Sequence, residues 1–337
     1  MTRFAAIGLD HRHVYDMTEG LLKAGAECVG YDPDTADPRM LAGFRKRFPH
    51  VPEKSRDRLL DDPSVAFIVL SAVPRDRAGL AVEAMRRGKD VMSDKPGVTT
   101  LEQLDLLRRA VRDTGRLWSV CVGRLTSPAL REAVRVVHSG ELGSLVQVMS
   151  LAPHRLNRAL RPAWFFDRAA YGGIINDIGV HSIDQFLALA GVPEAEIESS
   201  TIGAFGTEPE GFEDFAEITL RTPSVRGYCR VDWFTPDGLP TWGDGRLFLV
   251  GTDGTLELRK NLDIEGRAGT DHMFVASRER TRYMDCGALP VTYFHDFVTA
   301  VRTRDFAALP HEQAFTVCRM ALLAQANATR FIARRGQ

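Results

Sequence analysis

The chain lacks an excess of charge of either sign. Its 337 residues carry 43 Lys and Arg against 44 Asp and Glu, which gives a formal net charge of −1. It also has no long run of basic residues. Proteins that bind nucleic acid or an anionic membrane usually concentrate positive charge on one face or segment. We therefore expect neither nucleic acid nor a membrane as a partner.

Long apolar runs and paired cysteines are absent as well. The N-terminal segment reaches Asp10 and His11 too soon for the apolar core of a secretory signal, and no apolar stretch approaches the length of a membrane span. The five cysteines form no Cys-x-x-Cys pair. An odd number of scattered cysteines is typical of reduced thiols and not of a disulfide framework or a zinc cluster. We therefore expect a cytoplasmic protein.

The first 122 residues alternate short apolar runs with amphipathic ones. The pattern predicts strands at residues 4–8, 27–31, 66–72, 90–92 and 117–122, and helices at residues 14–24, 36–48, 77–87 and 101–114. Strands that alternate with helices pair in parallel through right-handed crossovers. The sequence therefore predicts an α/β domain with a doubly wound parallel sheet over residues 1–122.

Beyond residue 122 the pattern changes. Alternating stretches at residues 217–220, 227–233, 246–250 and 255–258 are separated by Gly, Pro and Asp, which indicates antiparallel strands joined by turns. Helical patterns at residues 293–302 and 312–333 close the chain. We predict that residues 123–337 form an α+β domain with a large, mostly antiparallel open sheet, and that its C-terminal helix packs back toward the first domain.

The run GGIINDIGVHSID, residues 172–184, combines an acid with an imidazole. On a helix, Asp177 and His181 lie four residues apart and therefore on one face, surrounded here by apolar residues. This is a common construction for an acid–base site on a rigid element. The alternative, given about equal weight on this run alone, is a core histidine hydrogen-bonded to its neighbour one turn away.

A second motif is Asp94-Lys95-Pro96, at the end of a predicted strand. The carboxyl ends of strands in an open α/β sheet border the crevice in which such folds bind ligands. Proline keeps the preceding Lys95 out of the helical region. Taken alone, the motif is better explained by an ordinary surface lysine at the end of a strand.

Together the two motifs resemble the Gfo/Idh/MocA family of nicotinamide-dependent oxidoreductases. That family has Glu-Lys-Pro where this chain has Asp94-Lys95-Pro96, and the glycine-rich run matches at Gly172, Gly173, Asp177, Gly179, His181 and Asp184. The resemblance implies an N-terminal Rossmann domain and hydride transfer between NAD(P) and a secondary hydroxyl or ketone of a cyclic polyol or sugar. It also implies a homodimer or homotetramer that assembles through the open sheet.

The resemblance also assigns roles to residues. His181 is the expected general base, Lys95 hydrogen-bonds the same substrate oxygen, and Asp177 orients the hydroxyl or the imidazole. The expected substrate contacts are Lys95, Arg124, His154, Arg155, Trp164, Asp177 and His181. For His154 and Arg155 a solvated loop is an equal alternative, and for Trp164 core packing is the commoner role.

The predicted cofactor turn, GLDHRHV, departs from the dinucleotide pattern G-x-G-x-x-G. Gly8 is retained, but Asp10 and His13 replace the second and third glycines. A carboxylate beside a pyrophosphate is unfavourable unless it turns away or is neutralised. The expected cofactor-binding residues are Gly8, Asp10, His11, Arg12, His13, Asp32, Ser71, Ala72, Pro74, Asp94 and Lys95.

Asp32 follows the second strand, where a carboxylate hydrogen-bonds an adenosine ribose and repels a 2′-phosphate. It favours NAD over NADP, although Asp32 is also a common type of turn residue before Pro33. His11 and His13 have the spacing of a metal-binding pair on a strand. Because no carboxylate or further histidine lies at a suitable distance in the sequence, we expect no metal site.

Two other functions remain open at this stage. The altered glycine turn is the reason to consider a second hypothesis, a lyase or epimerase that retains its cofactor and catalyses no net redox change. A third class, a sensor of sugar or dinucleotide, is expected to lack the residues Lys95, Asp177 and His181, which this chain has.

Overall fold

The computed structural model describes residues 1–207, 209–309 and 311–332, and leaves the side chains of residues 123, 124 and 332 undescribed. The chain divides into two compact units, each made of several segments. The first contains Met1–Cys121, Pro162–Gly172 and Thr292–Arg319, and the second contains Val122–Arg161, Gly173–Val291 and Met320–Gln337. A single domain boundary between residues 122 and 123 stays a sequence prediction.

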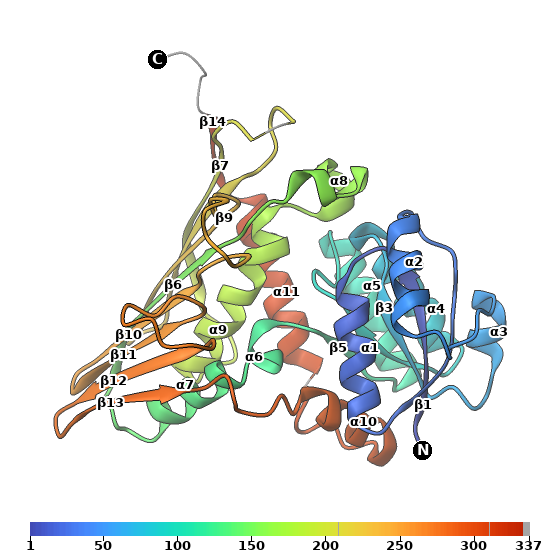
Figure 1. Cartoon of the computed structure of the whole chain (residues 1–337), viewed down its shortest axis with the longest axis horizontal. Coiled ribbons are helices and arrows are strands. Elements are labelled where there is room, and N and C mark those ends of the chain that lie inside the picture. Colours follow the sequence, from blue (N-terminus) through green and yellow to red (C-terminus); the bar gives the residue numbers. More distant parts are fainter. Residues whose placement is uncertain (208, 310, 333–337) are drawn as a thin grey trace. The chain divides into compact units, whose positions relative to one another are not determined.

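The first unit contains a five-stranded parallel sheet in the order β2-β1-β3-β4-β5. Every residue of β3 is buried, as expected for a central strand covered on both faces. The predicted doubly wound sheet is therefore confirmed (Figure 1). Its strands are β1 (Arg3–Leu9), β2 (Glu27–Tyr31), β3 (Phe67–Ser71), β4 (Asp90–Ser93) and β5 (Trp118–Val120).

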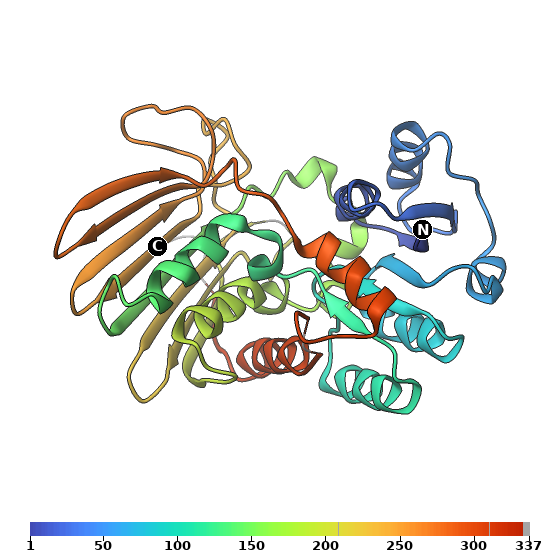
Figure 2. The ribbon, with the colours of Figure 1, turned by 90° about the horizontal axis from the view of Figure 1, so that it is seen from below.

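Helices cover both faces of this sheet. Helices α1 and α10 pack together on one face and α4 and α5 on the other (Figure 2). The six-residue α3 was not predicted, because so short a segment has too few turns to show a helical period. The unit contains α1 (His13–Lys23), α2 (Pro38–Arg47), α3 (Arg56–Asp61), α4 (Pro74–Arg86), α5 (Leu101–Thr114), η2 (Ala163–Phe166), α8 (Arg168–Tyr171) and α10 (Tyr293–Thr303).

The second unit is built on a nine-stranded sheet in the order β13-β12-β11-β10-β6-β9-β8-β7-β14. Only the pairs β6–β9 and β7–β14 are parallel among its described strands, so the predicted, mostly antiparallel sheet is confirmed. The strands are β6 (Leu145–Pro153), β7 (Glu196–Ala204), β8 (Phe215–Arg221), β9 (Arg226–Asp232), β10 (Arg246–Gly251), β11 (Gly254–Arg259), β12 (His272–Ser277), β13 (Thr281–Asp285) and β14 (Thr329–Ile332).

Helices α7 (Pro128–His138) and α9 (Val180–Ala190) lie along one face of this sheet (Figure 2). The short helices α6 (Gly123–Thr126) and η1 (Arg158–Leu160) also belong to this unit. The alternation in the sequence predicted β8 to β11 but missed β6, β7, β12, β13 and β14.

The predicted C-terminal helix is too long. Helix α11 (His311–Ala326) ends seven positions before the predicted end at residue 333, and strand β14 follows it. Thr329 and Phe331 belong to residue types that fit a pleated strand, and β14 gains a parallel partner in β7. Residues 329–332 therefore form a strand because the edge strand β7 is available as a partner, which the local sequence pattern does not show. Among the described residues, no helix combines the length and the apolar character needed to cross a bilayer.

Candidate functional site

The end of β1 packs tightly against the residue that follows β3. Gly8 has a φ of +67°, and a Cβ atom at this position would lie 2.4 Å from the Cβ of Ala72. Such a distance is far below van der Waals contact, so only glycine fits, and Ala72 must be small. The retained Gly8 therefore shapes the β1–α1 turn at the carboxyl edge of the sheet, where open α/β folds bind ligands.

Asp10 is hydrogen-bonded to the loops that follow β2 and β3. Its Oδ1 accepts hydrogen bonds from the Thr35 hydroxyl at 2.7 Å and the Ala36 amide at 2.5 Å, and its Oδ2 accepts one from the Val73 amide at 3.1 Å. The side chain is buried, with 7% of its surface exposed. Asp10 thus ties the loops after β2 and β3 to the β1–α1 turn, and three hydrogen-bond donors of the protein stabilise its negative charge.

Two backbone amides of the β1–α1 turn donate hydrogen bonds within the protein. The amides of Asp10 and His11 both donate to the carbonyl of Ser71, at 3.2 and 3.1 Å. In the described part of the chain, no backbone carbonyl accepts from the amides of Arg12 or His13. These two groups stand at the N-terminus of α1, where the helix dipole favours an anion.

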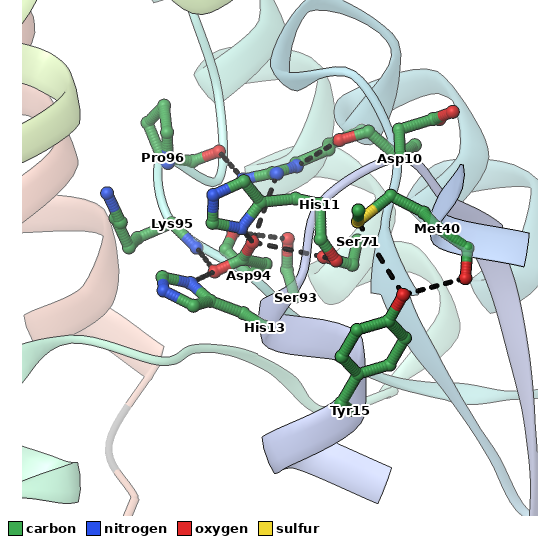
Figure 3. A network of polar contacts seen from close by, with 12 residues as sticks. Asp10, His11, His13, Tyr15, Met40, Ser71, Ser93, Asp94, Lys95 and Pro96 are labelled. Carbon is green, nitrogen blue, oxygen red and sulfur yellow. Dashed lines mark hydrogen bonds and ion pairs between the residues drawn. The ribbon is translucent and has the colours of Figure 1, made fainter. Parts of the chain in front are cut away.

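Asp94 is the centre of a buried polar network (Figure 3). Its Oδ1 accepts from the Lys95 amide at 2.7 Å and lies 2.8 Å from Nδ1 of His13. Its Oδ2 accepts from the Ser71 hydroxyl at 3.0 Å and from the guanidinium of Arg77 at 3.2 Å. Asp94 is fully buried, so its carboxylate positions its neighbours and the start of the Lys95-Pro96 segment.

Arg77 is a member of this network that the sequence did not reveal. It is 1% exposed, and besides Asp94 it donates to the carbonyls of Ala72 at 2.7 Å and Pro96 at 2.9 Å. The guanidinium therefore links the ends of β3 and β4. In the sequence, Arg77 is simply a charged residue near the start of an amphipathic helix, and nothing there separates it from a solvent-exposed arginine.

His11 makes an unusual contact with the same carboxylate. Its Nδ1 lies 3.0 Å from Asp94 Oδ2, yet this nitrogen is buried and has no hydrogen bond of acceptable geometry. Its ring meets the His13 ring edge-on, with 4.2 Å between their centroids. Burial, followed by the nearby His13, lowers the pKa of His11 to about 3, so this imidazole is neutral at pH 7.

Charges around Asp94 outweigh its burial. Burial by itself would raise the pKa of this carboxyl, but His13, Arg77 and His11 together hold the pKa well below its usual range. The carboxylate therefore remains ionised at neutral pH. A buried, ionised carboxylate that meets four donor atoms is a rigid element of the site.

Trp164 lies beside His11 in the first unit. The two ring centroids are 6.5 Å apart, and the indole Nε1 is buried without a hydrogen-bond partner. Buried indole N–H groups usually find an acceptor. A ligand oxygen that supplies one would satisfy this group, which is consistent with the predicted substrate contact at Trp164.

Asp32 follows β2 and is 5% exposed. Its Oδ2 accepts from Nε of Arg56 at 3.2 Å, and Arg56 also pairs with Asp34 at 3.1 Å. The carboxylate borders an open hollow of about 650 Å³ whose other walls include Lys54 and Arg58. The ribose acid predicted from the sequence therefore shares its surroundings with three cationic side chains.

The Asp177 and His181 motif belongs to the second unit, whereas Lys95 belongs to the first. The prediction of one regular helix is wrong in detail. Residues Ile175–Gly179 form a π-helical turn that contains Asp177, and α9 begins only at Val180. Single π-helical turns within helices often occur at functional sites. Asp177 is buried and His181 is partly exposed.

Gly173, at the start of this segment, has a φ of +94°, and a Cβ there would lie 2.3 Å from the side-chain amide of Gln325. Gln325 accepts from the Ile175 amide at 2.8 Å and donates to Glu213 at 3.0 Å. The glycine is needed because a buried polar side chain of α11 occupies that space. Gln325 and Glu213 were not predicted, because nothing local marks them.

The other expected substrate contacts have different surroundings. Arg155 donates to the carbonyls of Pro236 and Leu239 and so holds that loop, while His154 contacts its neighbouring Ala152 carbonyl at 3.0 Å. Arg124 is in α6, but its side chain lies outside the described residues. Whether these residues contact substrate stays a prediction.

Comparison with known proteins agrees with this architecture. Residues 130–257 match the family model of the GFO/IDH/MocA C-terminal domain. A crystal structure from Erwinia carotovora atroseptica SCRI1043, named as a candidate oxidoreductase, is 38% identical and covers 98% of this chain and 99% of its own, with a TM-score of 0.92.

Two curated relatives come from Bacillus subtilis. The chain is 26% identical to scyllo-inositol 2-dehydrogenase (NAD(+)) over 58% of its own length and 55% of the relative's. It is 24% identical to scyllo-inositol 2-dehydrogenase (NADP(+)) over 41% of its own length and 38% of the relative's. The chain thus matches about half or less of these relatives. The match to the family model and the 38% identity along almost the entire chain show that the protein belongs to the Gfo/Idh/MocA family of oxidoreductases.

Proposed function

We propose that the protein transfers a hydride between a nicotinamide cofactor and a secondary hydroxyl or ketone of a cyclic polyol or sugar. The observation that carries this proposal is the position of Lys95. It follows β4 at the carboxyl edge of a doubly wound sheet, and the buried Asp94 accepts a hydrogen bond from its backbone amide at 2.7 Å. Curated relatives with scyllo-inositol dehydrogenase names support the choice of a polyol.

The residues of the first unit fit a dinucleotide. Gly8 is required by close packing, the Asp10 carboxylate is hydrogen-bonded within the protein, and the amides of Arg12 and His13 are available to an anion. When bound, the nicotinamide would accept or donate the hydride. Asp32 supports NAD through hydrogen bonding to a ribose hydroxyl. Lys54, Arg56 and Arg58 weaken the repulsion of a 2′-phosphate, and the relatives bear both NAD(+) and NADP(+) names.

We assign the proton chemistry to Lys95, Asp177 and His181. An imidazole titrates near neutral pH, so His181 removes the proton from the hydroxyl during oxidation and returns it during reduction. The Lys95 ammonium stabilises the developing negative charge on the same oxygen. Asp177 orients the imidazole or the hydroxyl. This assignment rests on the family motif and on the local position of each residue.

Two assays test the proposal. The first is calorimetric titration of the cofactor-stripped protein with NAD, NADH, NADP and NADPH. The second is a screen of inositols and aldoses, followed by the absorbance of the reduced cofactor. We expect tighter binding of NAD(H) than of NADP(H) and turnover with a polyol. Failure of all four cofactors to bind would refute hydride transfer.

The altered turn favours one alternative, an epimerase or lyase that retains its cofactor. Asp10 and His11 use their amides within the protein, so a dinucleotide would be held by a different set of donors from that of a full glycine turn. Denaturation of the freshly purified protein separates the two proposals. Stoichiometric release of dinucleotide, together with turnover that consumes no added cofactor, would favour the alternative.

We further propose a cytoplasmic homodimer or homotetramer. All five cysteines are free thiols, which is consistent with a reducing compartment. Sedimentation of the purified protein measures its oligomeric state.

A further inference from the structure

The fold brings together two histidines and a carboxylate that are far apart in the sequence. His11 and His13 come from the β1–α1 turn and Asp94 from the end of β4. The candidate ligand atoms, one from each residue, all lie within 4.8 Å of one another. Figure 3 shows both imidazole rings beside the Asp94 carboxylate.

The distances match those between ligands of one small metal ion. Nδ1 of His11 is 3.0 Å from Oδ2 of Asp94, and Nδ1 of His13 is 2.8 Å from Oδ1 of the same carboxylate. In a tetrahedral zinc site, metal–ligand bonds of about 2.0–2.1 Å place neighbouring ligand atoms about 3.3 Å apart. The two imidazole–carboxylate distances lie close to this spacing, and the three candidate atoms are all within 4.8 Å of one another, so side-chain rotation is needed to complete the geometry.

A hydrogen-bond network alone leaves one observation unexplained. Nδ1 of His11 is buried, close to Asp94 and without a hydrogen bond of acceptable geometry. A buried polar atom without a partner is rare and indicates a missing ligand, ion or water. A cation placed between Nδ1 and the carboxylate accounts for this atom, because the lone pair then points at the ion.

The surroundings supply the further contacts that metal ligands usually have. Ligating carboxylates are themselves hydrogen-bonded in most metal sites. Here Ser71 and Arg77 hold Asp94 Oδ2, so the carboxylate keeps its orientation when an ion is bound. The positive charge of Arg77 opposes the binding of a dication. Two imidazoles and one carboxylate are a ligand set that suits zinc and similar transition-metal ions, which accept neutral nitrogen ligands.

We propose that His11, His13 and Asp94 form a binding site for a divalent transition-metal ion of the zinc class. Nδ1 of each histidine and one oxygen of Asp94 are the ligands. Three protein ligands leave at least one coordination position for water or for an oxygen of a bound anion or polyol. The site occupies the turn in which Asp10 and His13 replace two glycines of the dinucleotide pattern, so this inference does not depend on the proposed hydride transfer.

The test uses full-length protein without a histidine tag, stripped with a chelator. Co²⁺ is titrated while its visible absorption bands are recorded, and Zn²⁺ is titrated by calorimetry. We expect one equivalent per chain. The variant His13→Ala removes a ligand that is 35% exposed and should still fold. It should weaken binding more than about 100-fold, since even an outer partner of a metal ligand contributes about 10- to 100-fold.

The matched control is His50→Ala, which removes an exposed histidine elsewhere in the first unit and should leave binding unchanged. His11→Ala provides a second ligand variant, with circular dichroism as a check of folding. The proposal is overturned if the wild-type protein takes up neither ion at micromolar concentration, or if His13→Ala and His11→Ala bind as the control does. Titration of NAD in the same samples tests the proposed function separately.

Discussion

Replacement of Asp94 by asparagine should be among the most destabilising changes in the first unit. The side chain of Asp94 is fully buried, and its partner Arg77 is 1% exposed. Asparagine has nearly the same shape but carries no charge, so the guanidinium would remain buried without its counter-ion. Removal of one member of a buried ion pair costs about 3–5 kcal/mol. Domains of this kind are stable by only about 5–15 kcal/mol, so the loss is large.

The measurement is urea-induced unfolding in the presence of a chelator, which removes any contribution from bound metal. Asp57→Asn is the matched control, because Asp57 pairs with Arg87 but is 75% exposed. Exposed pairs contribute about 0–1 kcal/mol, so this variant should unfold nearly as the wild type does. A loss below about 1 kcal/mol for Asp94→Asn would refute the importance assigned to the buried pair.

A double variant tests the cause of the loss. Arg77→Met removes the cation, so the combination with Asp94→Asn leaves no uncompensated charge in the interior. The double variant should therefore lose less stability than the sum of the two single losses. If the two losses simply add, the ion pair is not the reason for the effect.

Three further predictions concern other positions. Burial raises the pKa of Asp232, so ionisation of this carboxyl lowers the stability of the folded protein as the pH rises from the unfolded-state pKa through the folded-state pKa. The variant Asp232→Asn should therefore raise the melting temperature at pH 7. This gain should vanish by about pH 4, where the carboxyl of the wild type is protonated in the folded state. Gly8→Ala should cost more than about 2 kcal/mol by thermal unfolding, because φ is +67° and the new Cβ meets Ala72 at 2.4 Å. Lys95→Ala and His181→Ala should lower kcat/KM by at least about 100-fold while the circular dichroism spectrum stays unchanged.

Each of these predictions has a contrasting outcome. If Asp232→Asn and the wild type have equal melting temperatures at pH 7, burial does not destabilise the ionised carboxylate of Asp232. For Gly8, the control is Gly79→Ala in α4, where a Cβ meets nothing within 4 Å and alanine should stabilise the helix. Retention of full activity in the Lys95 or His181 variant would remove that residue from the proposed acid–base set.

Several features of the fold follow from local patterns in the sequence. Strands β1 to β5 and helices α1, α4 and α5 were predicted within a few residues. A strand that is buried on both faces has an apolar run as its sequence, and a helix that is buried on one face has an amphipathic period. The sheet of the second unit was predicted in kind but not in extent. Strand β14 was mistaken for helix because its conformation depends on a partner strand more than 100 positions earlier.

The sequence alone determined the class of the protein. The Asp94-Lys95-Pro96 and Gly172 to Asp184 motifs indicated the family, because residue types at fixed spacing reflect the demands of one chemistry. Only the tertiary structure decided where the charges of the turn lie. It aimed Asp10 at the Thr35 and Val73 loops, paired Arg77 with Asp94, and brought that carboxylate to His11 and His13. These contacts join residues up to 83 positions apart, and side chains so distant are brought together by the packing of strands and helices, which no local pattern records.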